Sequence, residues 1–411
     1  MNDFMTERLY YHDSFLYNFD ARVLESAERN GRTAVVLDRT AFYPTSGGQV
    51  FDTGKFVLSD KRELPVTEVG EEEDGQIFHV VPENLEKGQS VVGLIDAARR
   101  RDHMQQHSGQ HVLSAAFVRL FNAPTVSFHM GVETCTIDLA VRSLSTVQLE
   151  KAEQLANEIV TEDRPVNIRF VSLEEARQLD LRKLPPKQRG DLRLIDIVDF
   201  DLTPCGGTHV RSTGQIGAIL LRKFENVKQA VRVEFVCGAR AVSTARQDYT
   251  TLTQAAAPLS AHIRELPQQI DKLLQENKAA GKTHHKLLEE LAELEAEQLL
   301  AQAKGTPRIV ISVFPERDGT FVKLLGQKVT ASSDQVIALL ASGAGQTTLV
   351  FAQTPGMKSN MGKLMKDAMS KLGGRGGGSA DMAQGGLPGP MDGAKMEQVL
   401  REVAANLEPM S

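Results

Sequence analysis

The histidines of residues 103–111 have a spacing that suits metal binding on a helix. His103, His107 and His111 each stand four residues from the next. Because an α-helix turns about every 3.6 residues, two such imidazoles project from one face and can share a metal ion. Spacing does not say which two of the three would bind, and most isolated pairs of this kind are surface or core histidines. His103 is then either a neighbour of the ligands or a surface residue.

A second group of donors lies much further along the chain, where Cys205 and His209 enclose Gly206-Gly207-Thr208. Glycines permit positive φ and carry no side chain, so a tight loop here can turn a thiolate and an imidazole inward together. Such a set of imidazoles with one thiolate suits Zn²⁺, and segments remote in sequence can share a metal. The alternative is an inert, reduced thiol beside a surface histidine.

The first 95 residues have the pattern of a β domain. Runs rich in strand-forming residues lie at 35–40, 55–60, 76–81 and 90–95, bounded by Gly, Pro and Asn. A turn-rich stretch at 44–48 separates the first two runs. Short strands at near-regular spacing favour a barrel over a βαβ layout. We therefore expect a β-barrel domain over residues 1–95.

Residues 96–250 change to an alternation of helices and strands. Asp96 can cap a helix that continues to about residue 121, because apolar residues recur there at helical spacing. A second helix is expected over 146–160, and strands over 136–140, 167–171, 194–200, 216–223 and 230–236. This alternation predicts an α+β domain over 96–250 that carries the metal ligands.

The segment 262–304 has a heptad repeat. Its a and d positions are Ile270, Leu273, Asn277, Ala280, His284, Leu287, Leu291, Leu294, Gln298 and Ala301. The repeat predicts a helical hairpin or coiled coil over 251–305, in which Gly281 is a turn between two antiparallel arms. A solvated spacer helix is the alternative interpretation.

The remaining residues, 306–411, predict a small C-terminal α/β domain. Strands are expected over 308–314 and 347–353 and a helix over 334–340, followed by a Gly-rich run at 373–378. That run either brings backbone N–H groups close to phosphate or forms a flexible loop.

Composition excludes several classes of protein. The 411 residues, 41% of them hydrophobic, suffice for roughly two to four folded domains. With 47 Lys and Arg against 53 Asp and Glu, the chain is no bulk polycation, so nucleic-acid contacts need local basic patches. Three cysteines exclude a disulfide scaffold and fit a reducing compartment. No signal peptide or membrane span is evident, so we expect a cytoplasmic protein with no membrane partner.

At these motifs the sequence resembles the free-standing alanyl-tRNA editing proteins of the AlaX type, in their long form, and the editing and C-terminal domains of alanyl-tRNA synthetase. The matching motifs are HSGQH at 107–111, CGGTH at 205–209, DRTAFYPTSGGQ at 38–49, TVSFHMG at 125–131 and GGRGGGSADMAQGG at 373–386. The resemblance thus spans nearly the whole chain. It implies Zn²⁺ as cofactor, with His107, His111, Cys205 and His209 as its ligands.

The resemblance also implies a reaction, hydrolysis of the ester in tRNA(Ala) that is mischarged with serine or glycine. The chain departs from the synthetases because its β region begins near the first residue, leaving no adenylation domain, so it is expected to edit in trans. Position 110 is Gln where many synthetases carry Thr. That departure leaves open how the pocket is tuned between serine and glycine.

Editing must spare alanine and attack serine, which is larger by one hydroxyl group. A pocket that hydrogen-bonds this hydroxyl discriminates better than one that measures size. Candidate contacts are Thr45, Ser46, Gln49 and Gln110, of which Thr45, Gln49 and Gln110 are our predicted catalytic residues. Each has a structural alternative, as a turn cap or a solvent-facing side chain.

Three basic clusters are candidate phosphate contacts: Arg99–Arg101; Lys183, Lys187, Arg189 and Arg193; and Lys358, Lys363, Lys366, Lys371 and Arg375. An alternative function is a tRNA-binding or assembly protein whose zinc is purely structural. In either case the coiled coil or the C-terminal domain can form a homodimer.

Overall fold

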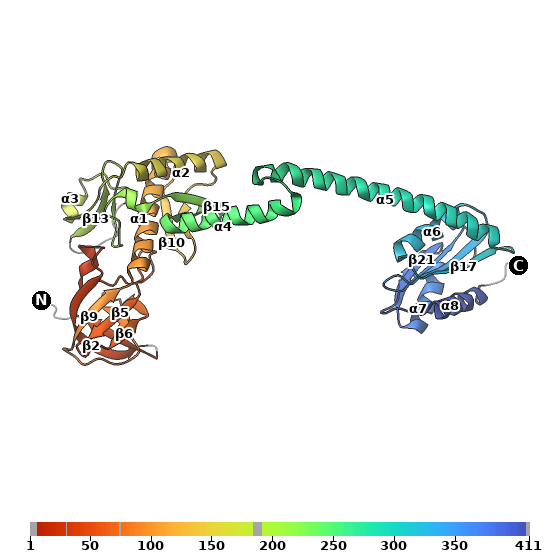
Figure 1. Cartoon of the computed structure of the whole chain (residues 1–411), viewed down its shortest axis with the longest axis horizontal. Helices are drawn as coiled ribbons and strands as arrows, with labels where there is room; N and C mark the ends of the chain where they lie inside the picture. Colours follow the sequence, from red (N-terminus) through yellow and green to blue (C-terminus); the bar gives the residue numbers. More distant parts are fainter. Residues whose placement is uncertain (1–5, 30, 74, 184–190, 408–411) are drawn as a thin grey trace. The chain divides into compact units, whose positions relative to one another are not determined.

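The structure is a computed structural model that describes residues 6–29, 31–73, 75–183 and 191–407. The chain divides into two compact units, Met1–Gln254 and Ala255–Ser411. Both units combine helices with sheets, as the predicted α+β class requires (Figure 1). The domain boundaries at 95, 250 and 305 stay predictions.

The first unit begins with a seven-stranded antiparallel sheet. In spatial order its strands are β6 (Glu63–Val66), β5 (Gly54–Leu58), β9 (Ser90–Ile95), β2 (Asn18–Arg29), β3 (Arg32–Leu37), β8 (Ile77–Val80) and β7 (Glu68–Glu71). Alternate residues of these strands are buried around Phe42 and Phe56. Two short parallel strands, β1 (Glu7–Arg8) and β4 (Arg39–Thr40), and the 3-10 turn η1 (Leu9–Tyr11) lie beside the sheet.

The seven strands do not close into a barrel, so the β-barrel prediction is wrong. β2 changes partner along its length, because its first half pairs with β9 and its second half with β3, with a register shift between Val23 and Glu25. Within the described residues, β6 pairs only with β5 and β7 only with β8. Only Thr67 separates β6 from β7. Even a tight hairpin needs a loop of about two residues, so these two edge strands cannot form the ladder that would close the sheet.

A long buried helix, α1 (Ala97–Phe121), connects this sheet to the next domain. Asp96 caps it by accepting hydrogen bonds from the backbone N–H groups of Ala98 and Arg99, and Asn122 ends it in the left-handed conformation. Arg100 on its first turn is fully buried and pairs with the carboxylate of Asp52, which precedes β5. This buried pair holds the start of α1 against the N-terminal sheet.

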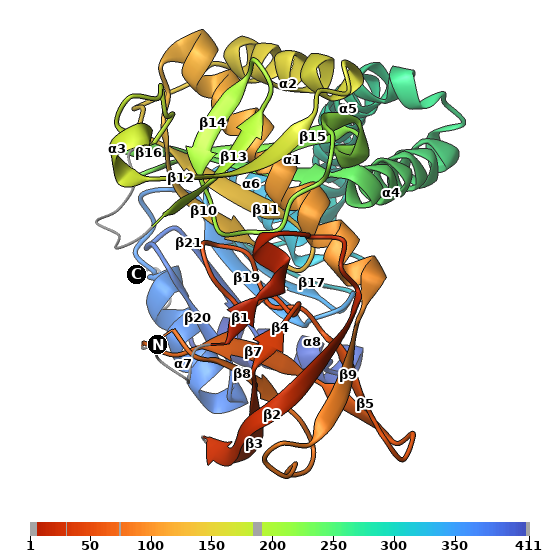
Figure 2. The same ribbon diagram turned by 90° about the vertical axis from the view of Figure 1, so that its left-hand side faces the viewer.

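Two sheets surround the rest of α1. One is the antiparallel sheet of β10 (Thr125–Met130), β11 (Cys135–Leu139), β16 (Ala230–Cys237) and β15 (Ile219–Val227), to which α2 (Thr146–Thr161) adds its apolar face. The other is formed by β12 (Val166–Val171), β13 (Leu192–Ile197) and β14 (Asp201–Pro204), with the short elements α3 (Leu173–Ala176) and η2 (Thr213–Ile216) nearby. Figure 2 shows β12, β13 and β14 grouped at one side of the unit.

The segment expected to be a hairpin is mostly one continuous helix. α4 (Gly238–Ala256) is followed by the turns η3 (Ala257–Leu259) and η4 (Ile263–Glu265) and then by α5 (Leu266–Gln302). Gly281 lies in the middle of α5, so the predicted turn at Gly281 is wrong. A single glycine costs a helix only about 1 kcal/mol, too little to break one of this length whose neighbouring residues are good helix formers.

The second unit is built on a five-stranded mixed sheet, β17 (Arg308–Phe314), β18 (Val336–Ser342), β19 (Thr348–Gln353), β21 (Met382–Gly386) and β20 (Arg375–Gly378), in that order. Helices α6 (Gly319–Ala331), α7 (Met361–Leu372) and α8 (Gly393–Ala405) pack on it, and the end of α5 packs with α6 through Ala292, Ala296 and Leu300. The predicted helix at 334–340 is wrong, because these residues lie mainly in β18. The Gly-rich run forms β20 rather than a loop.

Candidate metal centre

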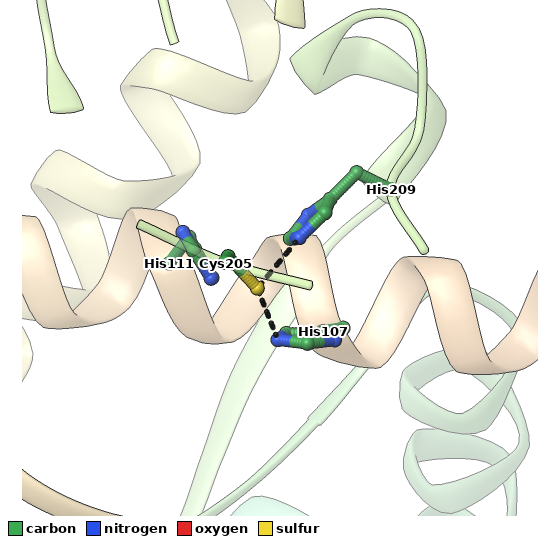
Figure 3. A group of neighbouring side chains, drawn as sticks. All are labelled: His107, His111, Cys205 and His209. Atoms are coloured by element: carbon green, nitrogen blue, oxygen red, sulfur yellow. Dashed lines mark hydrogen bonds between the residues drawn. The ribbon is translucent and has the colours of Figure 1, made fainter. Parts of the chain in front are cut away.

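Four side chains from two distant segments meet at the middle of α1. His107 and His111 lie one turn apart on this helix, and Cys205 and His209 come from the loop that follows β14 (Figure 3). The three histidines are buried, each less than 5% exposed. One potential ligand atom of each of the four residues lies within 4.8 Å of all the others.

The distances between these atoms fit a tetrahedral metal site. Sγ of Cys205 lies 3.4 Å from Nε2 of His107 and 3.3 Å from Nε2 of His209. In a tetrahedral zinc site the sulfur and nitrogen ligands are about 3.5 Å apart, given the usual Zn–S and Zn–N bond lengths. The three imidazoles and the thiolate also form a donor set that Zn²⁺ prefers.

The imidazole of His107 is oriented by Gln49. Nδ1 of His107 lies 2.7 Å from Oε1 of Gln49, which also accepts the backbone N–H of Thr208 at 3.1 Å. The amide nitrogen of Gln49 donates to Oγ1 of Thr208 at 2.8 Å. Since Oε1 accepts, the proton is on Nδ1 of His107, and Nε2 has a free lone pair toward Cys205.

The other two histidines also have a polar side chain close to Nδ1. Nδ1 of His209 lies 3.1 Å from Oγ of Ser108, which accepts the backbone N–H of Val210. Nδ1 of His111 faces a carboxylate oxygen of Asp201 at 3.4 Å. The same carboxylate accepts two hydrogen bonds from Arg182, at 2.5 and 3.1 Å. His107 and His209 are therefore hydrogen-bonded at Nδ1, the arrangement that metal-binding histidines usually show, whereas Nδ1 of His111 has only the longer approach to Asp201 and no hydrogen bond among the described residues.

The electrostatics of the cluster favour metal binding. Burial raises the pKa of the Cys205 thiol, but the imidazoles of His107 and His209 outweigh burial and hold this pKa well below its usual range. Burial lowers the pKa of His209 to about 3. For His111 burial also lowers the pKa, yet Asp201 and Cys205 together raise it above its ordinary value. The lowered pKa favours the thiolate form of Cys205, and the imidazole of His209 is neutral at neutral pH.

The two glycines after Cys205 differ in how much space a side chain would have. A Cβ atom on Gly207 would lie 2.1 Å from Cε1 and 2.4 Å from Nδ1 of His107, far closer than non-bonded atoms can approach. A Cβ atom on Gly206 would meet the Tyr11 hydroxyl at 3.4 Å, an ordinary contact. Gly207 is therefore the position at which the loop must lack a side chain to approach α1.

The cluster forms one wall of a cavity of about 740 Å³. His107, His111 and Cys205 line it together with polar and aromatic residues, among them Gln110, Thr125, Phe128, Phe170, Thr203 and Tyr43. Arg182, Lys183 and Arg193 add positive charge to its lining. A metal centre with access to a cavity of this size can act on a bound ligand.

The predicted catalytic residues have three different positions. Gln110 lines the cavity, whereas Gln49 is fully buried behind His107. Thr45 is exposed and is not part of the cavity lining, although its neighbour Ser46 is. His103 is buried but lies outside the four-residue cluster, and its Nδ1 has no partner among the described residues.

Sequence reasoning missed Ser108, Asp201 and Thr203. Asp201, Thr203 and Cys205 alternate along an extended segment, so a period of two would have placed them on one face of β14. Ser108 stands directly after His107, and no local pattern distinguishes it from a helix surface residue.

The basic clusters are only partly available for a ligand. Arg100 is fully buried with Asp52, so it is not a phosphate contact as we had expected. Arg193 is also buried, with hydrogen bonds to the carbonyl groups of Tyr11 and Cys205. Lys187 and Arg189 lie outside the described residues. Among the helices of residues 6–29, 31–73, 75–183 and 191–407, none has the length and hydropathy that a membrane span requires.

Three family models match the chain. They are described as tRNA synthetases class II (A), over residues 5–99, Threonyl and Alanyl tRNA synthetase second additional domain, over 192–234, and DHHA1 domain, over 300–408. The second match includes Asp201, Cys205 and His209. The matched segments thus contain half of the cluster and most of both units.

Whole-length similarity is found to curated proteins. The alanine–tRNA ligases of Pyrococcus abyssi and Natronomonas pharaonis are 32% and 33% identical over 92% and 93% of this chain, which spans 42% of either ligase. The alanyl-tRNA editing protein AlaX-L of Pyrococcus horikoshii is 32% identical over 394 residues, covering 93% of this chain and 94% of that protein. With this similarity along both whole proteins, the chain belongs to the family of alanyl-tRNA editing proteins of the AlaX-L type.

Proposed function

We propose that this protein hydrolyses the ester bond of tRNA(Ala) mischarged with serine or glycine, acting in trans in the cytoplasm. As a member of the alanyl-tRNA editing proteins, it is an editing hydrolase. The observation that carries the proposal is the convergence of three imidazoles and one cysteine sulfur, with His107, His111 and Cys205 on the wall of a large cavity. The cysteine thiolate among the ligands fits a reducing compartment.

We propose Zn²⁺ as the metal, held by His107, His111, Cys205 and His209. The fit of this donor set rests on the 3.3 and 3.4 Å ligand separations and on the Nδ1 hydrogen bonds of His107 and His209. A bound zinc ion would polarise an ester carbonyl or hold the substrate in position beside the attacking water. Gln49, Ser108 and Asp201 orient the imidazoles.

The residues of the cavity have roles in positioning the ester. Arg182 and Lys183 line it and can attract the phosphate groups of a tRNA 3′ end, an interaction that weakens as the salt concentration rises. The aromatic side chains of Phe128 and Phe170 provide surfaces for the ribose and base. Gln110 is placed to contact the aminoacyl group. Thr45, in its exposed position, has no support for the contact we predicted.

One observation favours a second function, tRNA binding or assembly with a purely structural zinc. The cluster offers four protein ligands, which would fill a tetrahedral zinc site, and closed tetrahedral zinc sites are normally structural. The cavity beside the cluster favours hydrolysis, because a purely structural site has no need of access to a ligand. We also propose a homodimer through the exposed apolar residues of α5.

The test is deacylation of purified Ser-tRNA(Ala) and Ala-tRNA(Ala). Wild-type protein is expected to release serine and spare alanine, and the double variant Cys205→Ala, His209→Ala is expected to release neither. Metal analysis should find about one zinc per chain, lost in that variant. Binding of tRNA without hydrolysis of any ester would favour the second function instead.

A further inference from the structure

Three polar side chains form a chain of hydrogen bonds beside the metal centre. Nε2 of Gln110 donates to Oγ of Ser114 at 2.7 Å, one turn further along α1. Oγ1 of Thr125, at the start of β10, donates to the same Oγ, also at 2.7 Å. Gln110 and Thr125 both line the cavity with His107 and His111, while Ser114 is fully buried behind them. Ser114 thus joins a helix and a strand on the cavity wall.

This arrangement leaves two hydrogen-bond acceptors without partners. Among the residues that the structure describes, Oε1 of Gln110 accepts no hydrogen bond, since the amide nitrogen makes the contact with Ser114. Oγ1 of Thr125 uses its proton toward Ser114, so its lone pairs are also free. Both atoms belong to residues that line the cavity beside the metal centre. The amino acid of a substrate held at that centre would lie next to them.

We infer that Gln110 and Thr125, held in place by Ser114, bind the side-chain hydroxyl of the seryl group. This inference rests on the proposed function and names the residues that give it selectivity. A seryl hydroxyl can donate to either free acceptor. An alanyl methyl group cannot, and it would cover the acceptor without pairing it, which is the condition under which a site rejects an analogue lacking the hydroxyl, whereas a glycyl group leaves space for a water molecule to pair it.

Other hydroxyl groups of the cavity are less suited to this role. Oγ of Ser127 donates to the carboxylate of Asp138 at 2.6 Å, and Ser46 is exposed. Thr203 is buried in the cavity wall on β14 and is a competing candidate that the test must separate.

The experiment compares Thr125→Val with wild-type protein on Ser-tRNA(Ala) and Gly-tRNA(Ala). Valine keeps the shape of threonine but lacks the hydroxyl, and glycine has no side chain to bind. We expect kcat/KM for the seryl ester to fall about 10- to 100-fold, while that for the glycyl ester changes by less than about 3-fold. Ser114→Ala should also lower kcat/KM for the seryl ester more than for the glycyl ester. Thr125→Ser should retain hydrolysis of the seryl ester.

Matched controls complete the design. Ser127→Ala removes a hydroxyl from the same cavity and should leave both rates unchanged, and every variant should keep the metal content of the wild type. Equal loss of both activities in Thr125→Val, no loss of either, or a seryl-specific loss in Thr203→Val alone would overturn the inference. If the wild-type protein releases neither amino acid, the proposed function itself fails.

Discussion

In the histidines of the candidate metal centre, the two ring nitrogens face different partners. Nδ1 contacts Gln49, Asp201 or Ser108, and this leaves Nε2 of His107 and His209 to face Cys205. Such partners set the tautomer and the orientation of the ring, and losing one typically weakens metal binding about 10- to 100-fold. We therefore expect the residues behind the proposed ligands to contribute to metal affinity.

The two glycines after Cys205 provide a matched pair for testing this geometry. Gly207→Ala places a methyl group in severe steric overlap with the ring of His107, so we expect about 10- to 100-fold weaker zinc binding. Gly206→Ala makes only an ordinary contact with Tyr11 and should bind zinc as the wild type does. Competition with a chromophoric chelator measures both. Equal affinity of the two variants would contradict the proposed part of His107 in the site.

His79 predicts a pH dependence of stability in the N-terminal sheet. Burial lowers its pKa to about 4 from 6.5, while its ring contacts Thr40 and the carbonyl of Val35. The unfolded chain therefore binds a proton that the folded state excludes. Its contribution to stability is complete above pH 6.5 and is lost as the pH falls from 6.5 toward 4.

From these values, acidification from pH 7.5 to 5 should cost about 2 kcal/mol of unfolding free energy through His79 alone. Urea unfolding followed by tyrosine fluorescence measures this cost, because Tyr10 and Tyr43 are buried in the same core. His79→Gln should remove that part of the pH dependence, whatever its own effect on stability at pH 7.5. An unchanged pH slope in the variant would refute the assignment.

Helix α1 shows how a local signal locates an element. Asp96 and the helical spacing of apolar residues predict a helix from 96 to about 121, and α1 covers Ala97–Phe121. The strand over 308–314 is also placed correctly. Residues 334–340 fail for a physical reason, since every residue of β18 is buried and a fully apolar run has no period that separates strand from helix.

Gly281 tests whether α5 is one helix or two arms. In a continuous helix, Gly281→Ala should stabilise the protein by about 0.5–1 kcal/mol, because alanine loses less conformational entropy and its Cβ atom would meet no neighbour. In a turn, the same change would be destabilising. Thermal unfolding monitored by circular dichroism gives the sign. Ala280→Gly, its neighbour, should have the opposite effect.

The proposed dimer would form through a seam of exposed apolar residues of α5. Ile270, Leu273, Leu287 and Leu294 occupy heptad positions and are 46–59% exposed. In the second unit α5 packs mainly through Ala292, Ala296 and Leu300, and of the heptad positions Leu291 also packs against this core. A 3.5-residue repeat of this kind matches a second helix of the same pattern, which a second copy of this chain supplies.

We therefore expect the 45.0 kDa chain to sediment as a dimer. The double variant Leu273→Lys, Leu287→Lys should be monomeric, because four buried charges in the dimer would repel one another. Lys278→Ala, away from the seam, is the control and should remain dimeric. Sedimentation velocity gives the molecular mass of each, and a wild-type monomer would contradict the proposal.

Local patterns were sufficient to predict α1, the strand at 308–314 and the donor types that a zinc site would need, because caps and helical spacing act within a few residues. The tertiary structure decided the rest. It brought the loop after β14 against the middle of α1, so that His107 and His111 lie with Cys205 and His209 while His103 does not. It also kept the first sheet open, left Thr45 at the surface and joined Gln110 to Thr125 through Ser114. Contacts between segments this far apart depend on how buried surfaces pack. The spacing of residues within one helix or strand does not predict that packing.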